Sequence, residues 1–89
     1  MKAVISVVGR DSVGIIAKVS ARCAEYSVNI LEISQTVLSG YFTMIMITDV
    51  SQLSVPFPEF ADAMAGLGRE SGLEIRAMHE DIFNAMHRI

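Results

Sequence analysis

Apolar residues recur along the chain with spacings that change several times, and each spacing indicates a different element. Residues 2–8 are mostly β-branched and nearly all apolar, which predicts a strand buried on both faces. Over residues 12–26 the apolar positions instead recur at helical spacing, which predicts one buried stripe. That stripe is expected to contain Ile16, Val19, Cys23 and Tyr26. Asp11 or Ser12 is expected to cap the start of this helix.

Two further strand patterns follow and are separated by a tight turn. Residues 28–38 and 41–50 are rich in β-forming side chains, and Ser39-Gly40 between them is a two-residue hairpin signal. Residues 41–50 carry apolar side chains on both faces of the predicted strand. One face is expected to hold Phe42, Met44 and Met46, and the other Ile45 and Ile47.

The last third of the chain predicts a helix, a strand and a second helix. After a loop over residues 51–57, Pro58 suits the first position of a helix that Gly72 ends, while Gly66 and Gly68 are expected to weaken it. Its inward stripe is expected to be Phe60, Met64 and Leu67. Residues 73–79 alternate as a strand does, and residues 80–89 form a C-terminal helical extension. Its apolar face is expected to hold Ile82, Met86 and Ile89, beside Phe83.

The predicted order is therefore β-α-β-β-α-β plus a C-terminal helix. With right-handed crossovers this order gives an α+β, ferredoxin-like sandwich, in which both main helices cover one face of an antiparallel sheet of order 4-1-3-2. The second strand is then an edge strand. The other face of the sheet must be covered by the C-terminal helix, by a partner subunit, or by both.

Composition changes this picture mainly by predicting self-association. A chain of 89 residues is expected to form one domain over residues 1–89, and a 52% hydrophobic content exceeds what so small a core can bury. We therefore expect a homodimer or higher oligomer, with Ile82, Phe83 and Met86 in or beside the interface.

Net charge, hydropathy and the single cysteine limit the possible partners, location and chemistry of the protein. The net charge is −3 and no basic run occurs, so neither nucleic acid nor an anionic membrane is expected as a partner. The sequence shows no signal peptide and no apolar run near the ~20 residues that span a bilayer, so a cytoplasmic location is expected. The single cysteine, Cys23, is expected to be a buried apolar residue rather than a nucleophile.

The turn between Gly9 and Gly14 is the candidate binding site. A strand that passes through such a turn into a helix can present free N–H groups to an anion. A phosphate-binding P-loop requires Lys and a hydroxyl after its last glycine, whereas Ile15 and Ile16 stand there, and the dinucleotide fingerprint is also missing. The turn is therefore either an anion pocket of another kind or only a change of chain direction.

Two stretches of the sequence resemble the ACT domain family. They are "GRDSVGI" over residues 9–15 and "SVNILEISQTV" over residues 27–37, and the resemblance covers residues 1–79. It is strongest to stand-alone bacterial ACT proteins related to glycine-cleavage regulators. Many members have Pro in place of Val13, and serine-binding members have His in place of Gly9, so serine is not indicated as the ligand.

The resemblance implies an amino-acid site at a dimer interface. Asp11 and Gly14 match ligand-loop positions, and Asn29 matches an asparagine that binds across the interface in some members. The predicted ligand-binding set is Asp11, Ser12, Val13, Gly14, Asn29 and Ile30. Independently, amides near Gly14 suit a carboxylate and Asp11 suits an ammonium group. In the alternative interpretation Asp11 only caps the helix, Gly14 only allows close packing and Asn29 only shapes a turn.

Two other functions would require residues that the sequence lacks. An acylphosphatase-like enzyme would need an arginine in the first helical turn, whereas Arg10 precedes the helix, and an RNA-binding sheet would need aromatics on its first strand. His79 and His87 are a weak candidate for a metal site. Glu32 and Asp49 are expected on solvated faces. We expect no enzyme, no cofactor and no metal, but a regulatory module that signals to a partner protein; the alternative is an interaction scaffold without a ligand.

Overall fold

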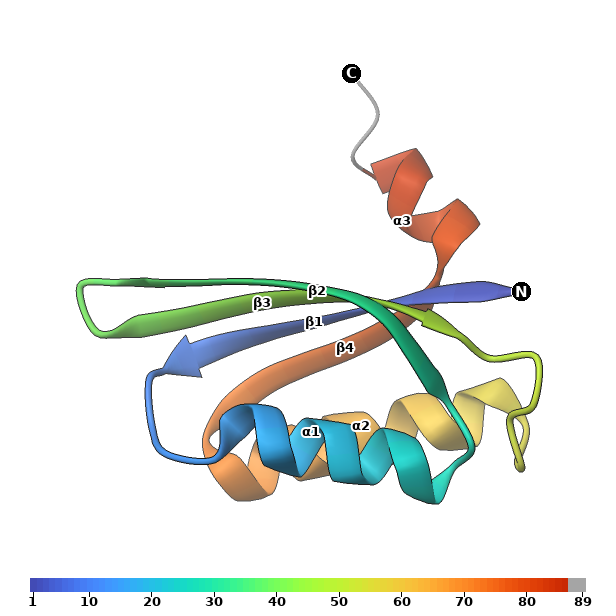
Figure 1. The fold of residues 1–89 in the computed structure, drawn as a ribbon, viewed down its shortest axis with the longest axis horizontal. Coiled ribbons are helices and arrows are strands. Elements are labelled where there is room, and N and C mark those ends of the chain that lie inside the picture. The colour runs from blue at the N-terminus through green and yellow to red at the C-terminus, as the bar shows by residue number, and fades with distance from the viewer. Residues whose placement is uncertain (87–89) are drawn as a thin grey trace.

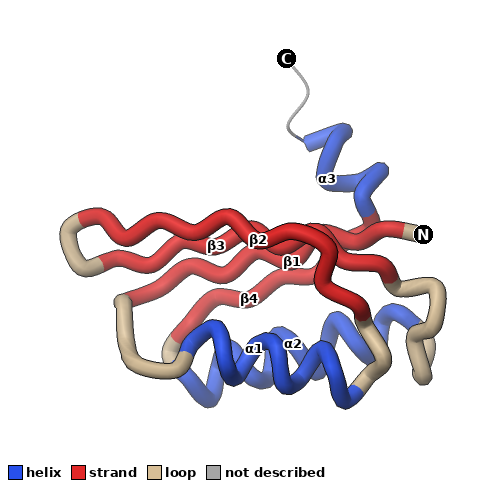
Figure 2. Tube along the Cα trace, in the orientation of Figure 1, coloured by secondary structure: helices blue, strands red, loops and turns tan. Residues whose placement is uncertain are grey.

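The computed structural model describes residues 1–86. Its elements, in the predicted order, are β1 (Lys2–Arg10), α1 (Ile15–Glu25), β2 (Asn29–Leu38), β3 (Tyr41–Asp49), α2 (Phe57–Ser71), β4 (Leu73–His79) and α3 (Glu80–Met86). The strands form a 4-stranded sheet of order β2-β3-β1-β4, which is the predicted order counted from the other edge. All neighbouring strands are antiparallel. Helices α1 and α2 lie side by side under one face of the sheet, and α3 rises from the opposite face (Figures 1 and 2).

The core lies between the sheet and the α1–α2 layer. Alternate residues of the two central strands point into it, so Ala3, Ile5 and Val7 of β1 are buried with Phe42, Met44 and Met46 of β3. Val19 and Cys23 of α1 and Phe60 and Met64 of α2 are completely buried opposite them. Each fully buried Val, Ile, Phe or Met side chain stabilises the fold by roughly 1.5–3 kcal/mol. The stripes predicted for the two main helices and for β3 are therefore confirmed in most positions.

Glycines determine two of the chain reversals and one close contact. Ser39 and Gly40 have φ of 53° and 81°, the geometry of the predicted two-residue hairpin turn. Gly72 ends α2 with φ of 70°. A Cβ atom on Gly68 would lie 2.6 Å from the Leu73 carbonyl oxygen, so this glycine lets α2 approach β4. The expected weakening of α2 does not shorten the helix, because this packing holds it to Ser71.

The first helix differs from its prediction at its start. It begins at Ile15 rather than at Ser12, and its N-cap is Gly14, with a left-handed φ of 84°. No side chain within residues 1–86 caps it, so the predicted Asp11 or Ser12 cap is wrong. Its buried stripe begins at Ile15, and Ile16 is partly exposed.

The first strand also differs from its prediction. It runs two residues further, to Arg10, because the long β2–β3 hairpin gives Gly9 and Arg10 pairing partners. The prediction that it is buried on both faces holds at Val4, which is 1% exposed, but fails at Val8, which is 46% exposed on the same outer face. That face is only partly covered, because α3 contacts β1 and β4 near one end of the sheet (Figure 1). Of the predicted C-terminal helix, Ile89 lies outside the described residues.

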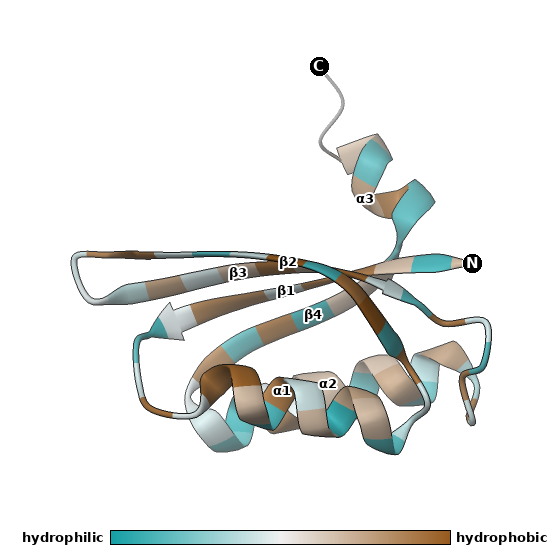
Figure 3. Ribbon diagram, viewed as in Figure 1, coloured by the Kyte–Doolittle hydropathy of each residue, from teal (hydrophilic) through white to brown (hydrophobic). Residues whose placement is uncertain are grey.

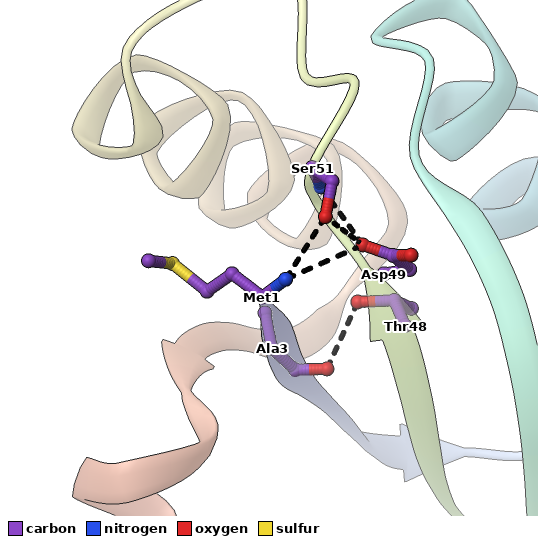
Figure 4. A network of polar contacts seen from close by, with 5 residues as sticks. All are labelled: Met1, Ala3, Thr48, Asp49 and Ser51. Atoms are coloured by element: carbon purple, nitrogen blue, oxygen red, sulfur yellow. Dashed lines mark hydrogen bonds and ion pairs between the residues drawn. The ribbon is translucent and has the colours of Figure 1, made fainter.

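The N-terminus is tied to the end of β3 by a polar network (Figure 4). The Met1 amino group donates to Ser51 Oγ at 2.9 Å and lies 3.7 Å from Asp49 Oδ1. That carboxylate oxygen also accepts hydrogen bonds from the Ser51 hydroxyl and the Ser51 backbone N–H. Asp49, predicted on a solvated face, is partly exposed but also joins the two chain segments.

Within the described part of the chain, no helix is long and apolar enough to cross a membrane.

Candidate functional site

A hollow of about 340 Å³ lies between the start of α1 and the core-facing side of the β2–β3 hairpin. Its volume is in the range of small-molecule sites. The residues that line it are Asp11, Ser12, Gly14, Ile15, Ile16, Ala17, Gln35, Val37 and Phe42. The turn that sequence reasoning selected therefore forms one wall, and the hairpin forms the other.

The loop before α1 is held against the hairpin by its backbone. The Asp11 N–H donates to the Gly40 carbonyl oxygen at 2.9 Å. A Cβ atom built on Gly14 would meet nothing within 4 Å. Glycine is therefore favoured here by the left-handed backbone conformation and not by close packing. The alternative that Gly14 only allows close packing is therefore wrong, and the space beside it is open.

The start of α1 is uncapped where it meets the hollow. The first N–H groups of any helix have no partner within the helix, and the positive end of the helix dipole lies there. No side chain of the described residues caps this start, and its first turn has no acidic residue. The Asp11 carboxylate is consequently not used as a cap. An anion in the hollow would meet donors at Ile15, Ile16 and Ala17 without competing with a cap.

The hairpin wall is apolar except at one position. Val37 pairs with Phe42 and Gln35 pairs with Met44, so Val37 and Gln35 both lie on the core-facing side of β2. Sequence reasoning did not select Gln35, Val37, Phe42 or Ala17 as site residues. The available signal was strand alternation, which places residues 33, 35 and 37 on one face and marks Gln35 as the polar member of that row.

The structure brings together only part of the predicted set. Asp11, Ser12 and Gly14 line the hollow, whereas Val13 points away from the fold and is 97% exposed. Asn29 and Ile30 lie at the opposite end of β2, where Asn29 pairs with Asp49. Gln35 lies six residue steps along the strand from Asn29, a span of roughly 20 Å. Within one chain, Asn29 therefore does not reach the hollow.

Arg10 and Cys23 both lie in structural surroundings. The Arg10 guanidinium lies 5.8 Å from the centre of the Tyr41 ring, and the two residues pair on the outer face of the sheet. Burial raises the pKa of the Cys23 thiol to about 11, which keeps it protonated at neutral pH. Neither group is placed for catalysis in the hollow.

The histidine candidate for a metal site is not assembled in the described residues. His79 stacks on Phe57 with ring centres 4.1 Å apart, and its Nδ1 is buried with no partner in residues 1–86. His87 lies outside the described residues. No cluster of three His, Cys, Asp or Glu side chains that could hold a metal occurs among those that the structure describes.

A second hollow, of about 480 Å³, lies where the N-terminus meets α3. It is lined by Met1, Lys2, His79, Glu80, Asp81 and Ile82, and no residue of the predicted site belongs to it. The hollow beside Gly14 is smaller, but it contains the uncapped helix start and three of the predicted residues. It is therefore the stronger candidate site.

Comparison with known proteins agrees with this fold. The family described as "ACT domain" matches residues 2–77. A UPF0237 protein from Clostridium perfringens is 51% identical over 89 residues, covering 100% of both chains. The solved ACT domain protein from Streptococcus pneumoniae is 40% identical, with a TM-score of 0.81 and 98% of each chain covered. A putative glycine cleavage system transcriptional repressor shares the fold at 22% identity, with a TM-score of 0.69, over 85% of this chain and 43% of that chain.

Proposed function

This chain belongs to the ACT domain family, whose members are in general regulatory modules that bind small molecules such as amino acids, and from this premise we propose that it binds an amino acid in the hollow beside Gly14. The observation that carries the proposal is the uncapped start of α1, which faces a hollow bordered by a carboxylate that caps nothing.

The chemistry of a free amino acid fits these groups. Its α-carboxylate suits the N–H groups of the first turn of α1 and the positive end of the helix dipole. Its ammonium group suits the Asp11 carboxylate, with the Ser12 hydroxyl beside it. Its side chain then extends toward the wall formed by Ile16, Val37 and Phe42.

We further propose that a second copy of the chain completes the site. β2 is an edge strand with exposed apolar side chains, among them Leu31, Ile33 and Val37. Such an edge is available for pairing, and a two-fold axis would pair two copies of β2 antiparallel. This pairing carries Asn29 and Ile30 of one copy toward residues 35–38 of the other, beside its hollow. Val13, exposed on the same loop, is then available to the second copy.

The proposed output is regulation of a partner protein in the cytoplasm, without catalysis. Ligand binding between two copies would change how they associate, and a partner can sense that change. The second candidate function is a scaffold without a ligand. The exposed apolar side chains of α3, Ile82 and Met86, support it, because they offer a protein-binding surface independent of the hollow.

A thermal-shift screen of the twenty amino acids tests the proposal. A ligand at about 100 times its dissociation constant stabilises the fold by roughly 2.7 kcal/mol. For a domain of this size that raises the melting temperature by about 10 °C or more. Asn29→Ala should abolish the shift and leave the ligand-free melting temperature nearly unchanged, because Asn29 is exposed.

The same screen separates the two candidate functions. If no amino acid shifts the wild-type protein, the amino-acid proposal fails and the scaffold becomes the leading function. If Asn29→Ala keeps the full shift, the ligand does not need the second copy's Asn29, although it still binds.

A further inference from the structure

Gln35 is the one amide side chain in the wall of the hollow, and no predicted role included it. We infer that Gln35 selects the ligand by its side chain, so that the hollow prefers an amino acid whose side chain is neutral and hydrogen-bonding, a carboxamide or a hydroxyl. This inference rests on the proposed function of the same site.

The position of Gln35 in the sheet supports a role in recognition. It pairs with Met44, which is completely buried, and it lies two residues before Val37, which pairs with the buried Phe42. Strand alternation gives this row of β2 an apolar character, with Ile33 and Val37 on either side of Gln35 along the same face. None of the hydrogen bonds assigned in residues 1–86 uses the Gln35 side chain to hold the hairpin together.

The location of Gln35 also places it opposite the groups proposed to hold the backbone of the ligand. The uncapped N–H groups and Asp11 lie on the α1 side of the hollow, and Gln35 lies on the hairpin side. An amino acid held by its α-carboxylate and ammonium group on the first side extends its side chain toward the second. The ligand side chain therefore meets the amide of Gln35.

The charges around the hollow restrict the ligand class. Asp11 is the one charged residue among those lining it, and the proposed site uses that charge for the ammonium group. Arg10, the last residue of β1, lies against the Tyr41 ring at the outer face of the sheet and does not line the hollow. Among the residues that line the hollow, an acidic ligand side chain would meet no cation, and a basic one would find no second carboxylate. An amide offers one donor group and one acceptor, which match a carboxamide or a hydroxyl.

Ligand pairs of nearly equal shape isolate this hydrogen bond. We would measure dissociation constants by calorimetric titration for threonine against valine, asparagine against leucine, and asparagine against aspartate. Wild-type protein should favour threonine over valine and asparagine over leucine by about tenfold, because a site that hydrogen-bonds a substrate group discriminates against analogues that lack it. It should also favour asparagine over aspartate, because no residue lining the hollow offers a cation to a second carboxylate. Gln35→Leu should remove or reverse the threonine and asparagine preferences over valine and leucine.

Thr36→Val is the matched control, because it also replaces a polar side chain of β2 with an apolar one. Thr36 pairs with Thr43 on the outer face, so its replacement should leave every preference unchanged. Gln35→Ala serves as a second variant, since it removes the amide without adding an apolar side chain to an edge strand. Far-UV circular dichroism of each variant checks that the fold is retained.

The outcomes distinguish the inference about Gln35 from the proposed binding of an amino acid. Loss of the polar preference in both Gln35 variants, with Thr36→Val unchanged, supports the inference. If wild-type protein binds amino acids but both Gln35 variants keep the wild-type ranking, the inference is wrong and the proposed function stands. If wild-type protein binds none of the amino acids, the proposed function fails, and this inference fails with it.

Discussion

Single side chains and backbone angles at the ends of the elements determine much of what this chain can do. Gly14 adopts a left-handed φ of 84° and ends the loop without a side-chain cap on α1. The result is a helix start whose donors remain available and a carboxylate, Asp11, that is not used as a cap. At the other end of the sheet, Asp49 has the opposite role, because its Oδ1 atom accepts two hydrogen bonds from Ser51 and lies 3.7 Å from the Met1 amino group.

The interactions of the Asp49 carboxylate predict how the stability of the fold depends on pH. The Ser51 hydroxyl and backbone N–H, and to a lesser degree the Met1 ammonium group, hold the pKa of Asp49 below its ordinary value of 3.8. Because the folded-state pKa is the lower one, Asp49 contributes stability above about pH 3.8, and this contribution is lost as the pH falls through the folded-state pKa. Asp49→Asn should therefore flatten the acidic part of the stability curve.

Urea unfolding between pH 3 and pH 6 measures this effect. Asp62→Asn is the control, because Asp62 is an exposed carboxylate of α2 outside the network. If Asp49→Asn and wild-type protein lose stability in parallel as the solution is acidified, the network does not contribute as described.

At the scale of elements, the contact between α2 and β4 shows why residues with poor helix propensity occur in a stable helix. Gly66 and Gly68 lie in the same helix, but their surroundings differ. A Cβ atom on Gly66 would come no closer than 3.6 Å to the Arg69 side chain, whereas one on Gly68 would lie 2.6 Å from the backbone oxygen of Leu73. Only Gly68 is therefore required by packing.

This difference predicts opposite effects for two identical substitutions. Gly68→Ala should destabilise the fold by about 1–3 kcal/mol, because the added methyl group forces α2 away from β4. Gly66→Ala should instead stabilise it by up to ~1 kcal/mol, because alanine has the higher helix propensity and its methyl group makes only an ordinary van der Waals contact with the Arg69 side chain. Chemical denaturation of the two variants gives both free energies. Equal effects of the same sign would contradict this account of the contact.

At the scale of the whole molecule, two regions of residues 1–86 expose apolar side chains, in addition to Val13 and Ile16 at the start of α1. One is the free edge of β2, and the other is the outer face of the sheet with α3 above it; apolar segments appear brown in both β2 and α3 (Figure 3). The proposed pairing of β2 strands covers the first region. Ile82 and Met86 of α3 are 52% and 60% exposed, so α3 offers apolar side chains at the place where the sequence predicts an interface.

Charge substitution on α3 tests that prediction. Ile82→Asp should weaken self-association by more than tenfold, because an interface would then bury an unpaired carboxylate. The fold should be retained, since Ile82 is exposed in the single chain. Asn84→Asp adds the same charge to an exposed position of the same helix and should have a smaller effect. Sedimentation velocity gives the association constants. A wild-type protein that sediments as a monomer, or an Ile82→Asp variant that associates normally, would contradict the predicted role of α3.

Local pattern in the sequence determined the elements and their order. Strand alternation, helical spacing, the Ser39-Gly40 turn and the Gly72 stop depend on neighbouring residues, so they could be recognised without knowing what packs against them. Sequence also identified the loop of the candidate site and three of its lining residues, Asp11, Ser12 and Gly14.

Only the tertiary structure decided which distant residues meet. Gln35 and Val37 face α1 because the pairing of β2 with β3 sets their side of the sheet. Asn29 lies far from the loop because it is at the opposite end of β2. Gly14 became the N-cap in place of Asp11 because Asp11 is held by the backbone of the hairpin turn. Contacts between segments far apart in the chain depend on register and layer packing, which spacing along one segment does not contain.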